Sequence, residues 1–270
     1  MDFRKIMYVI IIVVCVLSIA AGVYIQLLKQ VKKTDEIDMD VLYESKSQET
    51  LKKEFFAMFD NQLHPGSFDT RTIRKNDTEN DILYTVYSLQ EKTDNYDVDI
   101  NFPIINIKSE LADSLNEITQ TIFVNKANDI LLGKQKNNIY TVSYTGYING
   151  DIMSVIINAK IKEGTNPQRS IVKTYNYDLR NNKEVNVEDV LKNMSMDELS
   201  KKINSKIKDA IKEANELQVA GYNVYKRDID SDMYKAENIT DFYLGEDGKI
   251  YLIYAYGNNE FTSEMDIIVI

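Results

Sequence analysis

Side chains that commonly carry out catalysis are scarce in this sequence. There is one histidine, His64, and one cysteine, Cys15, which lies inside a long uncharged run. A Ser-His-Asp or Cys-His nucleophile, a histidine general base and a histidine-rich zinc site all need histidines near their partners. No G-x-S-x-G, P-loop or Rossmann glycine motif is present. Because His64 falls in a predicted stalk beside Pro65, the counts exclude these chemistries from the domain predicted at 79–270.

Acidic side chains are plentiful, with 42 Asp and Glu residues. They leave a two-carboxylate glycosidase arithmetically open, but they are too many to nominate a pair. The segment 228–239, "DIDSDMYKAENI", begins like an EF-hand calcium loop. However, Met233 stands where that loop needs Gly, and Ile239 where it needs Glu. We therefore expect an acidic turn there, and a chain that is not an enzyme, without a metal or cofactor.

The net charge restricts the partners. It is −10, with a sequence pI of about 4.8. A nucleic-acid-binding surface needs a basic footprint, and anionic lipid would be repelled, so both partners are disfavoured. A cationic partner would be attracted, chiefly through faster association. An acidic surface that only keeps the protein in solution is the simpler interpretation, and both stay open.

A membrane anchor is predicted near the N-terminus. Residues 6–28, "IMYVIIIVVCVLSIAAGVYIQLL", contain no charged side chain. At about 1.5 Å per residue, a helix of this length crosses a hydrocarbon core of roughly 30 Å. A secretory signal peptide with cleavage near "SIAAG" is the alternative, but the run continues beyond that point. We expect an uncleaved, single-pass transmembrane helix.

The orientation of the anchor rests on indirect arguments. Basic residues flank the run on both sides: Arg4 and Lys5, then Lys29, Lys32 and Lys33. Because both flanks are basic, the positive-inside rule does not decide which end of the anchor faces the cytoplasm. Residues 1–5 are too few to fold, and the chain after the run has no cysteine, which permits an oxidising compartment. We expect a short cytoplasmic tip at 1–5 and an extracytoplasmic bulk.

Residues 29–78 are predicted to form a stalk. "KQVKKTDEIDMD" is charged and lacks a core pattern. A short helix follows, ended by Pro65 and Gly66, with an apolar face that could pack on the domain or on a partner: Leu51, Phe55, Met58 and Phe59. "DTRTIRKNDTEND" then indicates a polar linker, and we place the start of the folded domain near residue 79.

The segment 79–270 predicts strands interrupted by two main helices. Alternating β-branched and aromatic residues mark the strands, and Asn149-Gly150 indicates a type I′ hairpin. Ser109 can cap a helix with one apolar face: Leu111, Leu115, Ile118 and Ile122. Ser195 and Glu198 form a capping box for a second amphipathic helix. We expect an α+β domain with a largely antiparallel sheet, in halves of about 79–165 and 166–270.

The chain ends in a tyrosine-rich hairpin. Both faces of "IYLIYAYG", residues 250–257, are apolar or amphipathic, so this strand should be central. The terminal "MDIIVI" should be a paired strand, because an unpaired one would be an aggregation-prone edge. Amphipathic side chains near the connecting turn suit sugar or protein recognition. Our candidate ligand contacts are Tyr254, Tyr256, Asn258, Asn259 and Phe261. The alternative is that the tyrosines fill a covered face and the asparagines shape the turn.

Three segments resemble the RsiV-type extracytoplasmic domain of lysozyme-sensing anti-sigma factors and some peptidoglycan deacetylases. They are "NFPIINIKSELADSLNEI" (101–118), "YNYDLRNNKEVNVEDVL" (175–191) and "DFYLGEDGKIYLIYAYGNNEFTSEMDIIVI" (241–270). The resemblance covers roughly residues 80–270. It implies the predicted α+β fold and binding of lysozyme or peptidoglycan.

The sequence departs from that family at three points. Only residues 1–5 precede the predicted span, where the anti-sigma members carry a sigma-binding segment. The deacetylase members add a metal-dependent catalytic domain whose histidines this chain lacks. The closing hairpin reads "YAYGNNEFTSEM", whereas the family often carries a proline-containing "Y-x-x-x-P-Y" stretch.

Two functions follow as expectations. The first is a membrane-anchored, non-catalytic binding or sensing domain of the bacterial cell envelope, with a cationic protein such as lysozyme, or peptidoglycan, as its partner. The second is a structural envelope or assembly protein that acts through a membrane partner. An enzyme that uses only carboxylates is a third reading, which turnover on glycan would reveal.

Overall fold

The computed structural model describes residues 48–133, 136–191, 194–218, 234–257 and 262–270. The chain divides into two compact units, Met1–Ser47 and Gln48–Ile270. The predicted tip, span and first part of the stalk therefore lie outside the described residues. Among the helices that are described, none is both long and apolar enough to cross a bilayer.

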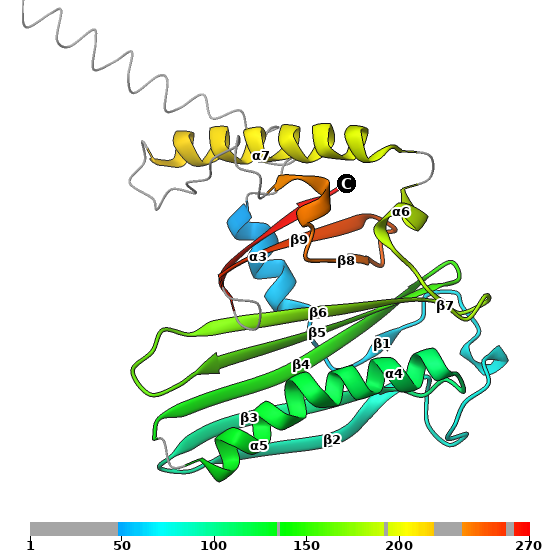
Figure 1. Cartoon of the computed structure of the whole chain (residues 1–270), viewed down its shortest axis with the longest axis vertical. Helices are drawn as coiled ribbons and strands as arrows, with labels where there is room; N and C mark the ends of the chain where they lie inside the picture. The colour runs from blue at the N-terminus through cyan, green and yellow to red at the C-terminus, as the bar shows by residue number, and fades with distance from the viewer. Residues whose placement is uncertain (1–47, 134–135, 192–193, 219–233, 258–261) are drawn as a thin grey trace, which may run out of the picture. The chain divides into compact units, whose positions relative to one another are not determined.

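Within Gln48–Ile270, the described strands form one ten-stranded mixed sheet (Figure 1). Its main path runs β2-β3-β4-β5-β6-β10-β9-β8, while β1 pairs with β4 and β7 with β6. The strands are β1 Leu63–His64, β2 Leu83–Lys92, β3 Tyr96–Ile105, β4 Asn138–Asn149, β5 Ile152–Lys162, β6 Arg169–Asp178, β7 Lys183–Glu184, β8 Asp241–Leu244, β9 Ile250–Gly257 and β10 Thr262–Val269.

The α+β fold with a largely antiparallel sheet is confirmed. Only β3–β4 and β1–β4 are parallel among the described pairs. The strand β9 lies between β8 and β10, and β10 pairs with both β9 and β6. The predictions that the first tyrosine-rich strand is central and that the terminal strand is paired are both confirmed.

The β4–β5 hairpin forms where predicted, but its turn differs. Asn149 pairs with Ile152, so Gly150 and Asp151 are the two loop residues. Gly150 has φ +61°, whereas Asp151 is not among the residues with positive φ. Because type I′ needs positive φ at both central positions and type II′ only at the first, usually Gly, the turn is of the II′ kind.

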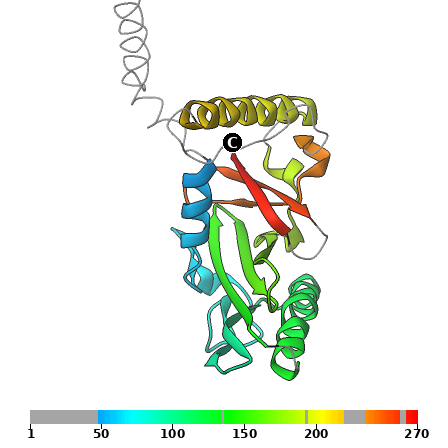
Figure 2. The same cartoon turned by 90° about the vertical axis from the view of Figure 1, so that its left-hand side faces the viewer.

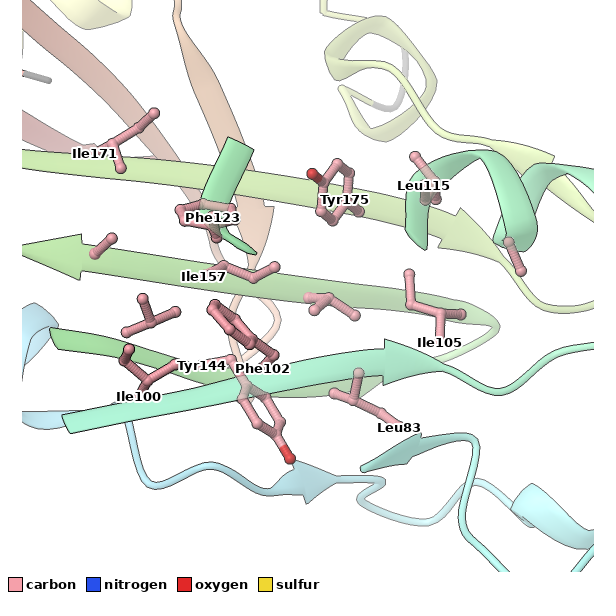
Figure 3. Packing of buried hydrophobic residues seen from close by; sticks show 14 of the residues in the cluster. Leu83, Ile100, Phe102, Ile105, Leu115, Phe123, Tyr144, Ile157, Ile171 and Tyr175 are labelled. Atoms are coloured by element: carbon pink, nitrogen blue, oxygen red, sulfur yellow. The ribbon is translucent and has the colours of Figure 1, made fainter. Parts of the chain in front are cut away.

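The helices α4 Glu110–Thr119 and α5 Asn125–Leu132, joined by the π-helical turn η2 Gln120–Val124, cover one face of β2–β6 (Figure 1). Ser109 caps α4 as predicted by accepting a hydrogen bond from Ala112 N at 3.0 Å. Leu115 and Phe123 belong to one buried cluster with the sheet, and Figure 3 shows Phe123 near Ile157 and Leu115 near Tyr175.

The buried stripe of α4 differs from the predicted one. It passes through Ala112, Leu115 and Thr119, and it leaves Ile118 42% exposed. Thr119 can occupy the buried position because its hydroxyl lies within hydrogen-bonding distance of two partners, Leu115 O at 3.0 Å and the Tyr175 hydroxyl at 3.2 Å, and its one proton can be donated to either. The hydrophobic pattern missed this shift because it cannot recognise a threonine whose polar group is satisfied internally.

The helix α7, Met196–Gln218, covers β9 and β10 on the side away from β4–β6 (Figure 2). Its predicted capping box is present, since Ser195 Oγ accepts from Glu198 N and the Glu198 carboxylate accepts from Ser195 N. Its aliphatic stripe packs against the sheet through Leu199, Ile203 and Ile207. The short helices α6 Val187–Val190 and η4 Ala236–Asn238 flank this layer.

The structure differs from the predicted domain boundary near residue 79. The compact unit begins at Gln48, with α3 Gln48–Ala57. Phe55 of α3 is buried against both halves of the sheet, and β1 pairs with Gly146 and Tyr147 of β4. The 3₁₀ turn η1 Thr70–Thr72 follows. Residues 48–78 are thus part of the domain, because their aromatic side chains pack on it, the first of the two fates considered above.

Candidate functional site

Four aromatic rings form a ladder across strands that are distant in sequence. His64 of β1 stacks on Tyr147 of β4 with ring centroids 5.4 Å apart. Tyr147 stacks on Tyr243 of β8 at 6.4 Å, and Tyr243 on Tyr251 of β9 at 4.7 Å with the planes inclined by 9°. The two outer contacts are cross-strand pairs, His64 with Tyr147 and Tyr243 with Tyr251. Strand register therefore builds the ladder.

A cavity of about 400 Å³ lies between the tyrosines of this ladder and α3. The volume is near the lower end of the range of about 300–1,000 Å³ for ligand pockets, so it suits a side chain or a single small ring. We call it the tyrosine pocket. Its lining residues are Leu51, Glu54 and Phe55 of α3, Met58 directly after that helix, Tyr147, Tyr243, Tyr251, Ile267 of β10, and Gly245, Glu246 and Asp247 of the β8–β9 turn.

Carboxylates stand on two sides of the pocket. Glu54 projects from α3, while Glu246 and Asp247 come from the turn, and all three residues are exposed. Partial burial acts to raise the pKa of Asp247, but hydrogen bonds from the backbone N–H and ammonium of Lys249 outweigh it and hold that pKa below its usual range. The carboxylate of Asp247 is therefore ionised at neutral pH.

The tyrosines of the pocket remain neutral phenols. Burial raises the pKa of Tyr251 to about 12, with the nearby charge of Asp247 acting in the same direction. Burial also raises the pKa of Tyr243 and of Tyr147. Two of these hydroxyls have acceptors: Tyr251 Oη donates to Asp247 Oδ2 at 3.2 Å, and Tyr243 Oη to Met58 Sδ at 3.7 Å. The rings thus present uncharged faces and edges beside charged carboxylates.

Gly245 allows the turn to close against the ladder. A Cβ at this position would lie 2.6 Å from Tyr251 Cε2 and 2.9 Å from Asp247 Oδ1. Both distances are shorter than a carbon atom tolerates, so any side chain would displace the ring or the carboxylate. The turn itself is held by a hydrogen bond from Gly245 N to Lys249 O at 3.0 Å. The glycine is therefore a requirement of the pocket's wall.

The arrangement has the chemical features of a binding site. An aromatic wall with carboxylates at its rim suits a cation, which the ring quadrupole and the charges both attract, or the apolar face of a sugar. Within the described part of the chain, no group of three or more His, Cys, Asp or Glu side chains is arranged to hold a metal ion.

The candidate contacts nominated from the sequence lie elsewhere or outside the described residues. Tyr254 of β9 is 1% exposed, and its ring packs edge to face on Tyr234 under α7. It therefore fills a covered face, the alternative considered for it. The backbone of Tyr256 belongs to β9, paired with Glu264, but its side chain is not described. Asn258, Asn259 and Phe261 lie outside the described residues, so the structure does not test them.

Sequence reasoning missed the ladder and its turn. The Asp247-Gly248 dipeptide between two apolar runs is a hairpin signal, and Gly248 does adopt positive φ, +74°. That signal pairs Tyr243 with Tyr251. Nothing local could place Tyr147 or α3 beside them, because those contacts join segments roughly a hundred or more residues apart.

No family model matches the sequence, and no curated protein matches it. Two solved structures of DUF3298 family proteins are similar to this chain. The one from Bacteroides fragilis is 16% identical, with 70% of this chain and 89% of that chain covered and a TM-score of 0.40. The one from Pseudomonas aeruginosa is 11% identical, with 70% and 86% covered and a TM-score of 0.40. Both are too distant for their properties to be transferred.

Proposed function

We propose that this chain is a single-pass, membrane-anchored, non-catalytic binding or sensing domain of the bacterial cell envelope. Residues 6–28 are the anchor and Gln48–Ile270 is the extracytoplasmic receptor unit. The resemblance to RsiV-type domains belongs to the same proposal. Its partner is a cationic wall-active protein such as lysozyme, or peptidoglycan, and nucleic acid has no part in it.

The observation that carries this proposal is the tyrosine pocket. Tyr147, Tyr243 and Tyr251 come from three strands of the two halves of the sheet, and α3 closes the opposite wall. The site depends on the whole compact unit being folded, with aromatic and acidic side chains converging on one cavity. Convergent polar groups in a pocket with apolar walls are the usual form of a ligand site.

The location of α3 supports a sensing role for a ligand in this pocket. Three pocket residues lie on α3, the first described element of the compact unit, and Met58 follows it directly. A ligand that contacts α3 and the sheet together stabilises the attachment of α3, because binding favours the state that binds. Occupancy of the pocket is thereby linked to the segment that leads to the predicted anchor.

The test is binding by the full chain, held in a mild non-ionic detergent, to hen lysozyme and separately to insoluble peptidoglycan. Each measurement is made at low and at physiological salt, because exposed charge attraction alone fades with ionic strength. We expect micromolar or tighter binding to one of them that persists at physiological salt.

Two variants connect that binding to the pocket. Tyr251→Ala removes one rung of the ladder, and Glu246→Lys reverses a rim charge on an exposed residue. Both should weaken binding, while Tyr87→Ala, which removes a 48%-exposed tyrosine of β2, should not. Thermal unfolding checks that each variant is folded. Absence of binding to both partners would overturn the proposal and favour the structural envelope function, which a co-purifying membrane complex would support.

A further inference from the structure

We propose that the tyrosine pocket binds the guanidinium group of an arginine side chain on a basic partner protein. This inference rests on the proposed binding function and names the chemistry of its ligand. Three properties of the pocket carry it: its charge, the hydrogen-bonding character of its rim, and the shape of its aromatic wall.

The charge of the pocket favours a cation. Three carboxylates line it, and none of the described residues that line it is basic. Lys249, which does not line the pocket, pairs with Asp247 at 3.1 Å, so the charge left to attract a cation is that of Glu246. Glu246 has no hydrogen-bond or ion-pair partner among the described residues, and its charge acts on Tyr147. A cation entering the pocket would supply the counter-charge that Glu246 lacks.

The rim accepts hydrogen bonds but has few donors to offer. Ionised carboxylates only accept. The hydroxyls of Tyr243 and Tyr251 already donate, to Met58 Sδ and to Asp247 Oδ2, so among the described lining residues only the Tyr147 hydroxyl is left as a side-chain donor. A sugar ring carries hydroxyls that need donors as well as acceptors, so this rim would leave some of them unsatisfied. A guanidinium has five N–H donors and no acceptor, which matches the rim.

The aromatic wall favours a planar cation over a compact one. The planes of Tyr243 and Tyr251 are nearly parallel, inclined by only 9°, and those of Tyr147 and Tyr243 by 20°. Because Tyr243 is stacked between Tyr147 and Tyr251, the ring face left for a planar ligand is that of Tyr251 turned away from Tyr243. A guanidinium can lie flat against that face and still direct its edge at carboxylates, whereas an ammonium is a compact point charge without a plane to stack. Phe55 and Ile267 provide apolar surface for the methylene stem.

The experiment uses the methionine that lines the pocket as a local reporter. The full chain in detergent is labelled with ¹³C at its methionine methyl groups, and the Met58 signal is assigned from its loss in Met58→Leu. Acetylated, amidated Gly-Arg-Gly, Gly-Lys-Gly and Gly-citrulline-Gly peptides are titrated in. Citrulline has nearly the shape of arginine without its charge, so it is the matched ligand control. Chitotriose is the glycan probe.

We expect the arginine peptide to shift the Met58 signal saturably and the lysine peptide to bind at least about threefold more weakly, and we expect no shift from citrulline. Glu246→Gln should weaken the affinity for the arginine peptide by about 3- to 10-fold, because it removes one hydrogen bond to a charged partner at an exposed rim. Glu117→Gln, which changes an exposed glutamate of α4, should leave the affinity for the arginine peptide unchanged.

Several results would overturn the inference. Equal shifts from citrulline and arginine would remove the role of charge, and a shift from chitotriose without one from arginine would assign the pocket to glycan. Binding that is unaffected by Glu246→Gln would place the peptide elsewhere.

The outcomes also separate this inference from the proposed function. If lysozyme or peptidoglycan binds in a Tyr251-dependent way while the arginine peptide leaves Met58 unmoved, the arginine site is wrong and the binding function stands. If neither macromolecule binds but the arginine peptide does, the arginine site stands and the envelope partners are wrong.

Discussion

The two faces of the β8–β10 part of the sheet use tyrosine in opposite ways. On the face toward α7, Tyr254 is 1% exposed and packs among Leu252, Ile268 and the helix's aliphatic stripe. On the face toward α3, Tyr251 is only partly buried and borders a cavity. The same strand, β9, supplies both residues, and strand alternation sends them to opposite sides.

The helices that cover the two faces explain the difference. The helix α7 spans Met196–Gln218 and presents leucine and isoleucine at regular spacing, which fills the space above the strands. The helix α3 spans only Gln48–Ala57, and Phe55 packs edge to face on Phe56 and Phe59. A short helix covers less of the sheet than a long one, and bulky aromatic rings fill the covered area less evenly than a regular row of leucine and isoleucine. The pocket is the space that this incomplete cover leaves.

The attachment of α3 includes polar contacts as well as aromatic packing. The side-chain amide of Gln48 donates to Ile267 O at 2.9 Å and accepts from Ile267 N at 3.4 Å. On its β6 side, β10 pairs with that strand, among the described residues, only at Thr262. The Gln48 amide therefore takes the place of a neighbouring strand further along β10, at Ile267. Covering a strand edge in this way is a common protection against aggregation. Because polar contacts at its edge help to hold α3 on the sheet, this face can keep its hydrophobic core and still leave room for a binding site.

The largest effect that would test this comparison is expected for Tyr254→Ala. It removes a fully covered aromatic ring and should lower the free energy of unfolding by about 3–5 kcal/mol. Tyr251→Ala should cost less, about 1–2 kcal/mol, because that ring is partly exposed. Urea denaturation followed by circular dichroism measures both. Similar costs for the two substitutions would show that the faces do not differ in packing.

The ligand response should run in the opposite order. In the fraction that remains folded, Tyr254→Ala should keep its affinity for the ligand of the pocket, whereas Tyr251→Ala should lose it. Tyr254→Phe is the milder control, since it removes only the 3.4 Å hydrogen bond to Lys235 O. A loss of binding in Tyr254→Phe would contradict the separation of the two faces.

Lys52→Met, which changes a residue of α3, should have an intermediate effect. Lys52 Nζ lies 3.4 Å from Asp266 Oδ1, and the Asp266 side chain is 0% exposed and also accepts from the Tyr234 hydroxyl at 2.8 Å. Methionine keeps the apolar stem but removes the cation from a buried carboxylate. Because Lys52 is itself partly exposed, we expect a cost of about 1–3 kcal/mol rather than the full penalty of a buried pair.

The control for Lys52→Met is Lys201→Met, which changes an exposed lysine of α7. It should change the free energy of unfolding by less than about 0.5 kcal/mol. Hydrogen exchange gives a second readout, since Lys52→Met should speed exchange in α3 more than in α7. Equal acceleration in both helices would mean that this contact stabilises the domain generally and does not hold α3 in particular.

Local patterns predicted most elements of the fold. Alternation, capping residues and turn dipeptides located the strands of the two halves, both main helices and the paired terminal strand. These features depend on neighbours within a few residues. The errors arose where a satisfied polar group replaced an apolar one, as at Thr119, and where only Gly150 of a turn adopted positive φ.

The tyrosine pocket could not be predicted in the same way. His64 and Tyr147 meet because β1 pairs with β4, and Tyr147 meets Tyr243 because β8 lies against β4–β6. Neither contact has a signal in the residues around it. Residues 60–78 are mostly polar, so the sequence pattern provided no sign that Phe68 and Ile73 pack on the large core and attach that segment to the domain. Long-range contacts decide both the boundary and the site.

The smallest expected effect concerns the polar contacts between β8 and β6. The Asp241 carboxylate accepts from Thr174 N at 2.9 Å and lies 3.5 Å from Lys173 Nζ. Burial raises its pKa above the ordinary value of 3.8, although Lys173 and Thr174 act to lower it. A carboxyl whose pKa is raised by folding gives stability that is complete below its unfolded pKa and is lost as the pH rises through its folded pKa.

Asp241→Asn should remove this pH dependence, because the amide does not titrate but can still accept from Thr174 N. Relative to the parent chain, the variant should therefore gain stability as the pH rises from about 4 towards neutrality, and the two should differ least near pH 3. Urea denaturation across this range measures the difference. Asp129→Asn, on the exposed surface of α5, should give a curve parallel to the parent's. If the variant instead loses stability relative to the parent as the pH rises, Lys173 and Thr174 outweigh burial. The contacts between β8 and β6 would then be stabilised by the charge of Asp241.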